Sequence, residues 1–152
     1  MGFDEHLRLT SSFRKRIPKR ERVLVFVQFP DLMKKVAEAF TANHIKFLEI
    51  KGSAAQKSKN LEKFQNDSEE RVLLLIVTDE SASGANLTSA NHAIFLSPLL
   101  TTTQEIYDAC ETQAIGRLRR YGQTNLVHIW RFLTTNTIDM EIYEQRTKKK
   151  IT

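Results

Sequence analysis

The stretch Val72–Val77, VLLLIV, is the most apolar run in this 152-residue chain. An unbroken run of branched apolar side chains suits a strand buried on both faces, so we expect a central strand here. Val23–Phe29, VLVFVQF, has the same character, with β-branched and aromatic residues that favour strands. The other runs that predict strands are Ile45–Ile50, Ala93–Leu96 and Leu126–Phe132.

Helical patterns separate these strands. From Asp31 to Phe40, apolar residues recur at spacings of three and four, which predicts a helix with one buried face. A serine or threonine followed three residues later by Gln or Glu is a capping box, and it predicts two further helix starts. These pairs are Ser53 with Gln56 and Thr102 with Glu105. A last helix is expected from Thr137, with Ile138 and Ile142 packed against the domain.

Strand and helix therefore alternate along the chain. This alternation predicts an α/β domain in which helices cover both faces of a parallel sheet. In such sheets, ligands bind outside the carboxyl ends of the strands. We therefore expect functional residues in the loops Lys51–Ser53 and Thr78–Thr88, and in the region that leads into the helix after Thr102.

The composition is that of a globular domain. Hydrophobic residues make up 41% of the chain and charged residues 27%, which suits one domain with a sizeable core. No apolar run approaches the length of a membrane span and the N-terminus has no signal-peptide core, so we expect no membrane partner. The single cysteine, Cys110, excludes an internal disulfide and fits a reducing compartment. We expect it on the inner face of its helix, as a buried and inert thiol.

The net charge of +5 comes from the two ends of the chain. Residues 1–22 carry seven basic and three acidic side chains, three lysines stand at 148–150, and the stretch between nets −2. A broad positive field is therefore not predicted, and contact with nucleic acid must be local or made by the ends. We assign residues 1–22 as a basic lead-in or linker, 23–147 as the domain and 148–152 as a basic tail.

Gln113–Gln123, QAIGRLRRYGQ, is the stretch with the most specific pattern. On a helix, the spacings of four and three between Gln113, Arg117 and Arg120 place them in one polar stripe. Two guanidinium groups aimed at one place repel each other, which indicates an anion there, and arginine's planar fork of donors suits phosphate oxygens. The alternative from the residues alone is a solvated basic face on a surface helix, because charged helix faces are common.

Two kinds of site are not indicated by the sequence. None of the five glycines begins Gly-Lys-Ser or Gly-Lys-Thr, so the chain has no phosphate-binding P-loop. The four histidines lack metal-ligand spacing, so no metal site is predicted. These histidines are His6, His44, His92 and His128.

Four stretches, in this order, resemble the second RecA-like lobe of superfamily-two helicase-type ATPases, and specifically that of Swi/Snf-like translocases. They are VLVFVQF at 23–29, KGSAAQKSKNLEKFQ at 51–65, SASGANLTSANHAIFLSP at 81–98 and QAIGRLRRYGQTNLVHIWRFL at 113–133. The resemblance covers about Val23 to Tyr143. Its most specific part is the spacing of glutamine, two arginines and Gly-Gln within 113–123, because glutamine after the glycine favours Swi/Snf-like enzymes.

The resemblance implies a fold and a division of labour. The fold is a RecA-like parallel sheet, a helicase C-terminal lobe without a P-loop. In this family the first lobe carries the P-loop and the magnesium-binding carboxylates, so ATP with Mg²⁺ would be bound mainly by an absent N-terminal lobe. The second lobe supplies arginines to the γ-phosphate: Arg120 matches the arginine finger and Arg117 its companion. The implied nucleotide-binding residues are Gln113, Gly84 and Asn86.

The same resemblance implies a nucleic-acid surface. Gln28 and Gly52-Ser53 match loops that touch the phosphates of the tracked strand. Thr78 and Ser81 belong to the element that connects DNA contact to the nucleotide. Small residues there permit a close approach of the backbone, so that amide groups can donate to phosphate. From the residues alone, Gln28 is equally a surface polar residue.

The implied function is that of the C-terminal ATPase lobe of a DNA-dependent translocase that remodels chromatin or another protein–DNA complex. The expected partners are the N-terminal ATPase lobe of the same chain and duplex DNA, free or in nucleosomes, in the nucleus. Alone, the fragment should not hydrolyse ATP. Two alternatives stay open: a degenerate lobe that only binds nucleic acid or protein, motivated by the altered loop Glu80–Ser83, and part of a strand-separating helicase.

Overall fold

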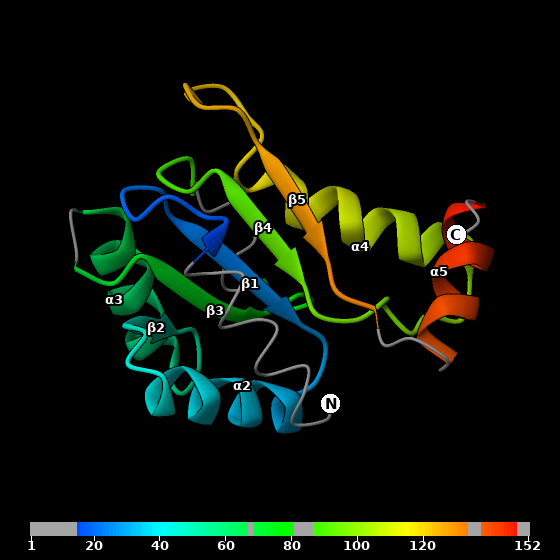
Figure 1. Cartoon of the computed structure of the whole chain (residues 1–152), viewed down its shortest axis with the longest axis horizontal. Coiled ribbons are helices and arrows are strands. Elements are labelled where there is room, and N and C mark those ends of the chain that lie inside the picture. Colours follow the sequence, from blue (N-terminus) through cyan, green and yellow to red (C-terminus); the bar gives the residue numbers. More distant parts are fainter. Residues whose placement is uncertain (1–14, 67–68, 81–86, 134–137, 149–152) are drawn as a thin grey trace.

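Five parallel strands form one sheet in the computed structural model, which describes residues 15–66, 69–80, 87–133 and 138–148. The strands are β1 (Val23–Val27), β2 (Phe47–Glu49), β3 (Val72–Ile76), β4 (His92–Phe95) and β5 (His128–Arg131). Their order is β2-β3-β1-β4-β5, and every neighbouring pair is parallel (Figure 1). β1 is the middle strand. β3 lies between β2 and β1, so the prediction of a central strand at Val72–Val77 is confirmed.

The helices are α2 (Pro30–Ala42), α3 (Ala54–Gln65), α4 (Gln104–Gly116) and α5 (Ile138–Thr147). The predicted start of α3 is confirmed, because the Ser53 hydroxyl accepts a hydrogen bond from the backbone N–H of Gln56 at 3.2 Å. The predicted cap of α4 is wrong by one residue. Thr103 has the extended backbone of an N-cap, and its hydroxyl accepts from the N–H of Ile106 at 3.1 Å.

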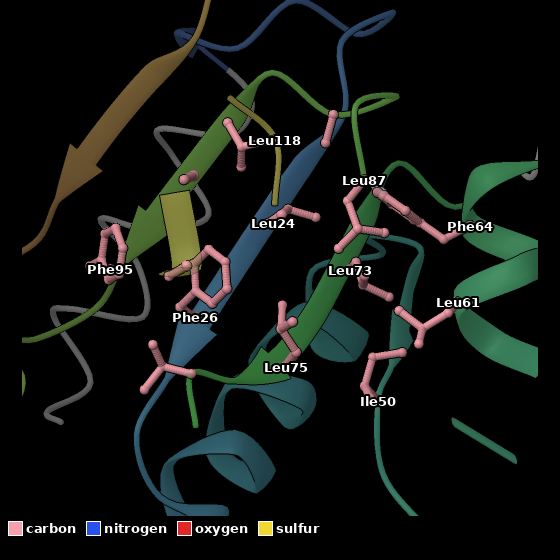
Figure 2. Packing of buried hydrophobic residues seen from close by; sticks show 14 of the residues in the cluster. Leu24, Phe26, Ile50, Leu61, Phe64, Leu73, Leu75, Leu87, Phe95 and Leu118 are labelled. Carbon is pink, nitrogen blue, oxygen red and sulfur yellow. The ribbon is translucent and has the colours of Figure 1, made fainter. Parts of the chain in front are cut away.

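Alternating side chains of the strands divide the core into two clusters, one on each face of the sheet. On one face, Leu24 and Phe26 of β1 pack with Phe64 of α3 and Tyr107 of α4. Figure 2 shows this cluster, which also includes Leu61, Leu73, Leu75, Phe95 and Leu118. On the other face, the remaining residues of β1 pack with Met33, Val36 and Phe40 of α2. Helices therefore cover both faces, as predicted for this α/β fold.

The last helix is attached by polar contacts. The side chain of Gln104, in the first turn of α4, donates to the Arg146 carbonyl at 2.8 Å, and Arg146 donates to the Thr101 carbonyl at 2.8 Å. Figure 1 shows α5 beside the start of α4. Ile138 is 65% exposed, so the prediction that it packs against the domain is wrong, and Ile142 is half-buried.

Packed structure begins upstream of Val23. Ile17 is 3% exposed and belongs to the α2 side of the core, and the Arg71 guanidinium donates to the Pro18 carbonyl at 2.7 Å. The described part of the lead-in therefore contacts the domain, while the boundary at Val23 stays a prediction. Among the described residues, no helix is long and apolar enough to cross a membrane.

Candidate functional site

The carboxyl ends of three adjacent strands bring several predicted residues to one edge of the sheet. β2, β3 and β1 are parallel neighbours, so the loops after them lie side by side (Figure 1). These loops carry Gln28 after β1, Gly52 and Ser53 after β2, and Thr78 after β3. The predicted residues Ser81, Gly84 and Asn86 lie outside the described residues.

Gln28 has a structural partner that the sequence did not reveal. Its side-chain amide donates to the Leu100 carbonyl at 2.7 Å and accepts from the Leu100 N–H at 2.8 Å. This pair of bonds joins the end of β1 to the loop between β4 and α4. One amide hydrogen of Gln28 is left for an outside acceptor.

Gly52 and Ser53 form an exposed turn that leads into α3. Gly52 has a φ of +90°, a left-handed conformation that glycine adopts without steric cost. The Ser53 oxygen is used as a helix cap, but its hydroxyl hydrogen can still be donated. The turn therefore offers donors at the N-terminus of a helix, where negative charge is favoured.

The predicted arginine stripe is wrong in its geometry, because α4 ends at Gly116. Beyond it, the chain turns: the N–H groups of Leu118 and Arg119 both donate to the Ile115 carbonyl, at 3.1 and 2.9 Å. Gln113 and Arg120 are exposed, whereas Arg117 is only 5% exposed. The three side chains therefore do not share one face.

Tertiary hydrogen bonds explain why the helix ends. The Arg117 carbonyl accepts from the N–H of Leu87 at 3.0 Å, a bond from the β3–β4 connection instead of from the next helical turn. The Gln123 side chain donates to the carbonyls of Leu118 and Ala90, both at 2.8 Å. Leu118 itself is fully buried. The sequence singled out Gln123 only as a family marker. Its two hydrogen bonds connect the segment Arg117–Arg120, here called the arginine segment, to the β3–β4 connection (residues 77–91).

Arg117 is a buried cation with incomplete hydrogen bonding. Its Nη2 lies 3.5 Å from the Val77 carbonyl, just beyond β3, and its guanidinium lies 5.7 Å from the centre of the Phe26 ring. Nη1 is shielded from solvent and has no hydrogen-bond partner in the described structure. Burial lowers the pKa of Arg117, and the Asp79 carboxylate opposes this effect. A buried donor without an acceptor is costly, so an acceptor that reached Nη1 would be bound favourably.

Asp79 is also paired with a lysine. Lys57 Nζ lies 2.9 Å from Asp79 Oδ2, and the two side chains are 25% and 12% exposed. This ion pair is therefore better shielded than an ordinary surface pair. It joins the second turn of α3 to the loop after β3, next to the carbonyl that Arg117 contacts.

A pocket of about 640 Å³ opens elsewhere, at the opposite edge of the sheet. Its lining includes Lys19, His44 and Arg71, and none of the described site residues belongs to it.

Two of the histidines that the sequence shows far apart meet at the amino ends of β4 and β5. His92 and His128 are register partners, with stacked rings 4.7 Å apart. With Glu21 they form a group whose possible metal-ligand atoms lie within 4.8 Å of one another. The spacing of the histidines along the chain therefore did not reveal this pair.

The geometry of this group does not suit a metal ion. Trp130 Nε1 donates to His92 Nδ1 at 3.0 Å, so neutral His92 carries its proton on Nε2, the atom that faces Glu21 Oε1 at 3.3 Å. A metal would have to displace that proton. In addition, two stacked imidazoles cannot both hold one ion in the plane of their rings. We interpret the group as structural.

This group makes the stability of the domain sensitive to acid. Burial lowers the pKa of His92, opposed by Glu21, and a hydrogen bond from Asn91 lowers the pKa of Glu21. Neutral His92 therefore contributes stability that is complete above its unfolded pKa of about 6.5 and is lost as the pH falls below it. The Glu21 contribution is lost at lower pH, as the pH falls through its lowered folded pKa.

We expect the free energy of unfolding to fall by up to about 1.4 kcal/mol per pH unit below pH 6.5 because of His92. Denaturant unfolding of this chain between pH 7 and pH 5 measures the slope. His92→Asn keeps an acceptor for Trp130 but does not titrate, so it should flatten the slope, whereas His44→Asn should not. An unchanged slope in His92→Asn would contradict this assignment.

The fold and the site together define a class of protein. A five-stranded parallel sheet with helices on both faces is a RecA-like fold, the fold of helicase-type ATPase lobes. Residues 6–122 match the helicase conserved C-terminal domain family, so the chain belongs to this family. Its relatives place it in the Swi/Snf-like branch of superfamily two.

Three similar proteins have names that refer to DNA or chromatin. The chain is 54% identical over 132 residues to the DNA (cytosine-5-)-methyltransferase DMT5 of Cryptococcus neoformans, covering 86% of this chain and 6% of that protein. It is 33% identical to the DNA repair protein rad5 of Neurospora crassa, covering 95% and 11%. It is 27% identical to the protein CHROMATIN REMODELING 24 of Arabidopsis thaliana, covering 93% and 12%.

A solved structure has the same fold. The C-terminal part of the Fun30 ATPase domain superposes with a TM-score of 0.76 at 24% identity, over 98% of this chain and 46% of that chain. The chain thus spans a small part, between 6% and 12%, of the relatives described above.

Proposed function

We propose that this chain is the second ATPase lobe of a longer Swi/Snf-like protein that hydrolyses ATP to move along duplex DNA. It closes on an N-terminal lobe that holds ATP and Mg²⁺. The observation that carries this proposal is the arginine segment after α4, in a chain with no P-loop of its own. There, Arg117 has a buried donor without an acceptor, and Arg120 is exposed three residues later.

The two arginines have separate tasks in this proposal. Negative charge spreads over the oxygens of the γ-phosphoryl group as it is transferred, and a guanidinium held against these oxygens stabilises that state. Arg120, on the surface, reaches the nucleotide when the lobes close. Arg117 rotates out from the Val77 carbonyl and gains the acceptor that its Nη1 lacks. Gln113 flanks the segment and, with Gly84 and Asn86, completes the nucleotide side.

The nucleic-acid side of the proposal uses the carboxyl edge of the sheet. The Gly52–Ser53 turn offers backbone and hydroxyl donors at the start of α3, and Thr78 is exposed beside it. Such donors suit the phosphates of a DNA strand and carry no base specificity. Gln28 extends this surface, and Ser81 is assigned to nucleic-acid binding from the family resemblance alone. It would track the backbone rather than read sequence.

The names of the relatives support DNA as the substrate and the nucleus as the location. They also raise a second candidate for the longer protein. The 54% identity to a DNA (cytosine-5-)-methyltransferase favours a protein in which this lobe serves cytosine methylation. Methyl transfer to DNA by the full-length protein, with and without ATP, tests this candidate.

ATP hydrolysis by the full-length protein, with and without duplex DNA, tests the proposal. We expect DNA to raise the turnover number by at least about 10-fold, in the usual range of coupling between two binding sites. Single-stranded RNA is the control and should have a smaller effect. A turnover number that is the same with and without duplex DNA would contradict the proposal. It would favour a degenerate lobe that only binds a partner.

A further inference from the structure

Asp79 lies between two cations that come from different helices. Lys57 of α3 forms the 2.9 Å ion pair with its carboxylate. Arg117, at the end of α4, approaches the Val77 carbonyl two residues before Asp79, and the Asp79 charge favours the protonated guanidinium. Arg117 still has a buried donor, Nη1, that has no partner in the described structure.

Each cation is connected to one half of the proposed site. Lys57 lies one turn after the Gly52–Ser53 loop, and its N–H donates to the Ser53 carbonyl at 3.0 Å. Arg117 is three residues before Arg120, in a segment that Gln123 and Leu87 fasten to the β3–β4 connection. The Lys57–Asp79 ion pair and the Arg117–Val77 contact therefore connect the nucleic-acid loop and the arginine segment to the same stretch after β3.

We infer that Asp79 is a positioning residue that passes the effect of nucleic acid at the Gly52–Ser53 loop to Arg117 and Arg120. This inference rests on the proposed function and adds residues to which the family resemblance assigned no role. DNA phosphates at the start of α3 attract the Lys57 ammonium and weaken its pair with Asp79. The carboxylate then accepts from another N–H of Arg117, which orients the guanidinium so that Nη1 is presented to the nucleotide, and orders the residues that follow it.

Substitutions in the full-length protein test the link through the ratio of ATP turnover with duplex DNA to turnover without it. Lys57→Met and Asp79→Asn should each lower this ratio by about 10-fold. The double variant should be no lower than Asp79→Asn, because Lys57 acts through Asp79. Lys59→Met, an exposed lysine on the same helix, is the matched control and should keep the wild-type ratio.

The outcomes separate this inference from the proposed function. If DNA stimulates the wild type and the variants Lys57→Met and Asp79→Asn keep the same turnover ratio as Lys59→Met, the inference is wrong. The proposed function is then unaffected. Additive losses in the double variant would also overturn it, since Lys57 would then act elsewhere. A purely structural role predicts an equal loss of both rates and an unchanged ratio. If duplex DNA does not change the ATP turnover of the wild type, both the proposed function and this inference are wrong.

Discussion

Replacing Arg120 with alanine in the full-length protein should lower the rate of ATP hydrolysis by about 10³-fold or more, the usual effect of losing an arginine finger. The side chain is exposed, so its removal leaves no cavity in the core. The thermal midpoint should therefore stay close to that of wild type. Steady-state hydrolysis at saturating duplex DNA, beside a melting curve, measures both quantities.

Arg119 offers a matched control for this experiment. It lies next to Arg120, is exposed and belongs to the same turn after α4. Arg119→Ala removes an equal charge and should keep most of the activity. Near-normal turnover in Arg120→Ala, or an equal loss in both variants, would contradict the assignment of Arg120.

Replacing Arg117 with methionine should separate activity from stability. Methionine fills much of the same volume beside Phe26 and removes a buried charge whose hydrogen bonds are incomplete. Exchanging a buried ionic group for an apolar one is often neutral or stabilising, so the free energy of unfolding should change by less than about 1 kcal/mol. ATP hydrolysis should nevertheless fall by about 10²-fold, the scale of one lost donor to the transition state.

Arg117→Lys is the companion variant. It keeps the positive charge but loses the planar fork of donors, so it should recover only a small part of the activity. Denaturant unfolding and steady-state hydrolysis are measured on both variants. If the free energy of unfolding falls together with the rate of ATP hydrolysis in these variants, Arg117 has a structural role only.

The strands could be predicted because their side chains are buried on both faces. β1 and β3 are apolar at every position, a pattern that few other structures require. The cap of α4 shows the limit of such patterns. Thr102 and Thr103 are equally suitable by type, and only the backbone conformation decides that Thr103 accepts from Ile106.

The arginine segment shows what a helical spacing cannot reveal. The stripe of Gln113, Arg117 and Arg120 assumes that the helix continues, but the sequence carries no signal for the partner that ends it. That partner is the N–H of Leu87, thirty residues away, which donates a hydrogen bond to the Arg117 carbonyl. Burial of Arg117 follows from this turn and from the fit of its side chain over Phe26.

The histidine pair and the aspartate link were missed for a related reason. His92 and His128 meet only because β4 and β5 pair in one register, and no spacing within the chain predicts it. Lys57 lies in α3, just after the loop that follows β2, and Asp79 lies in the loop that follows β3. The sequence placed both loops at that edge, but not these two side chains against each other.

The central claim is that this lobe stabilises the transition state of a nucleotide held by another lobe. The most direct measurement is binding of ADP with fluoroaluminate, a mimic of the transferred phosphoryl group, to full-length wild type and Arg120→Ala in the presence of duplex DNA. We predict nearly equal affinity for ADP alone, and trapping of the mimic at least about 10²-fold weaker in the variant. Equal trapping by both proteins would contradict the claim.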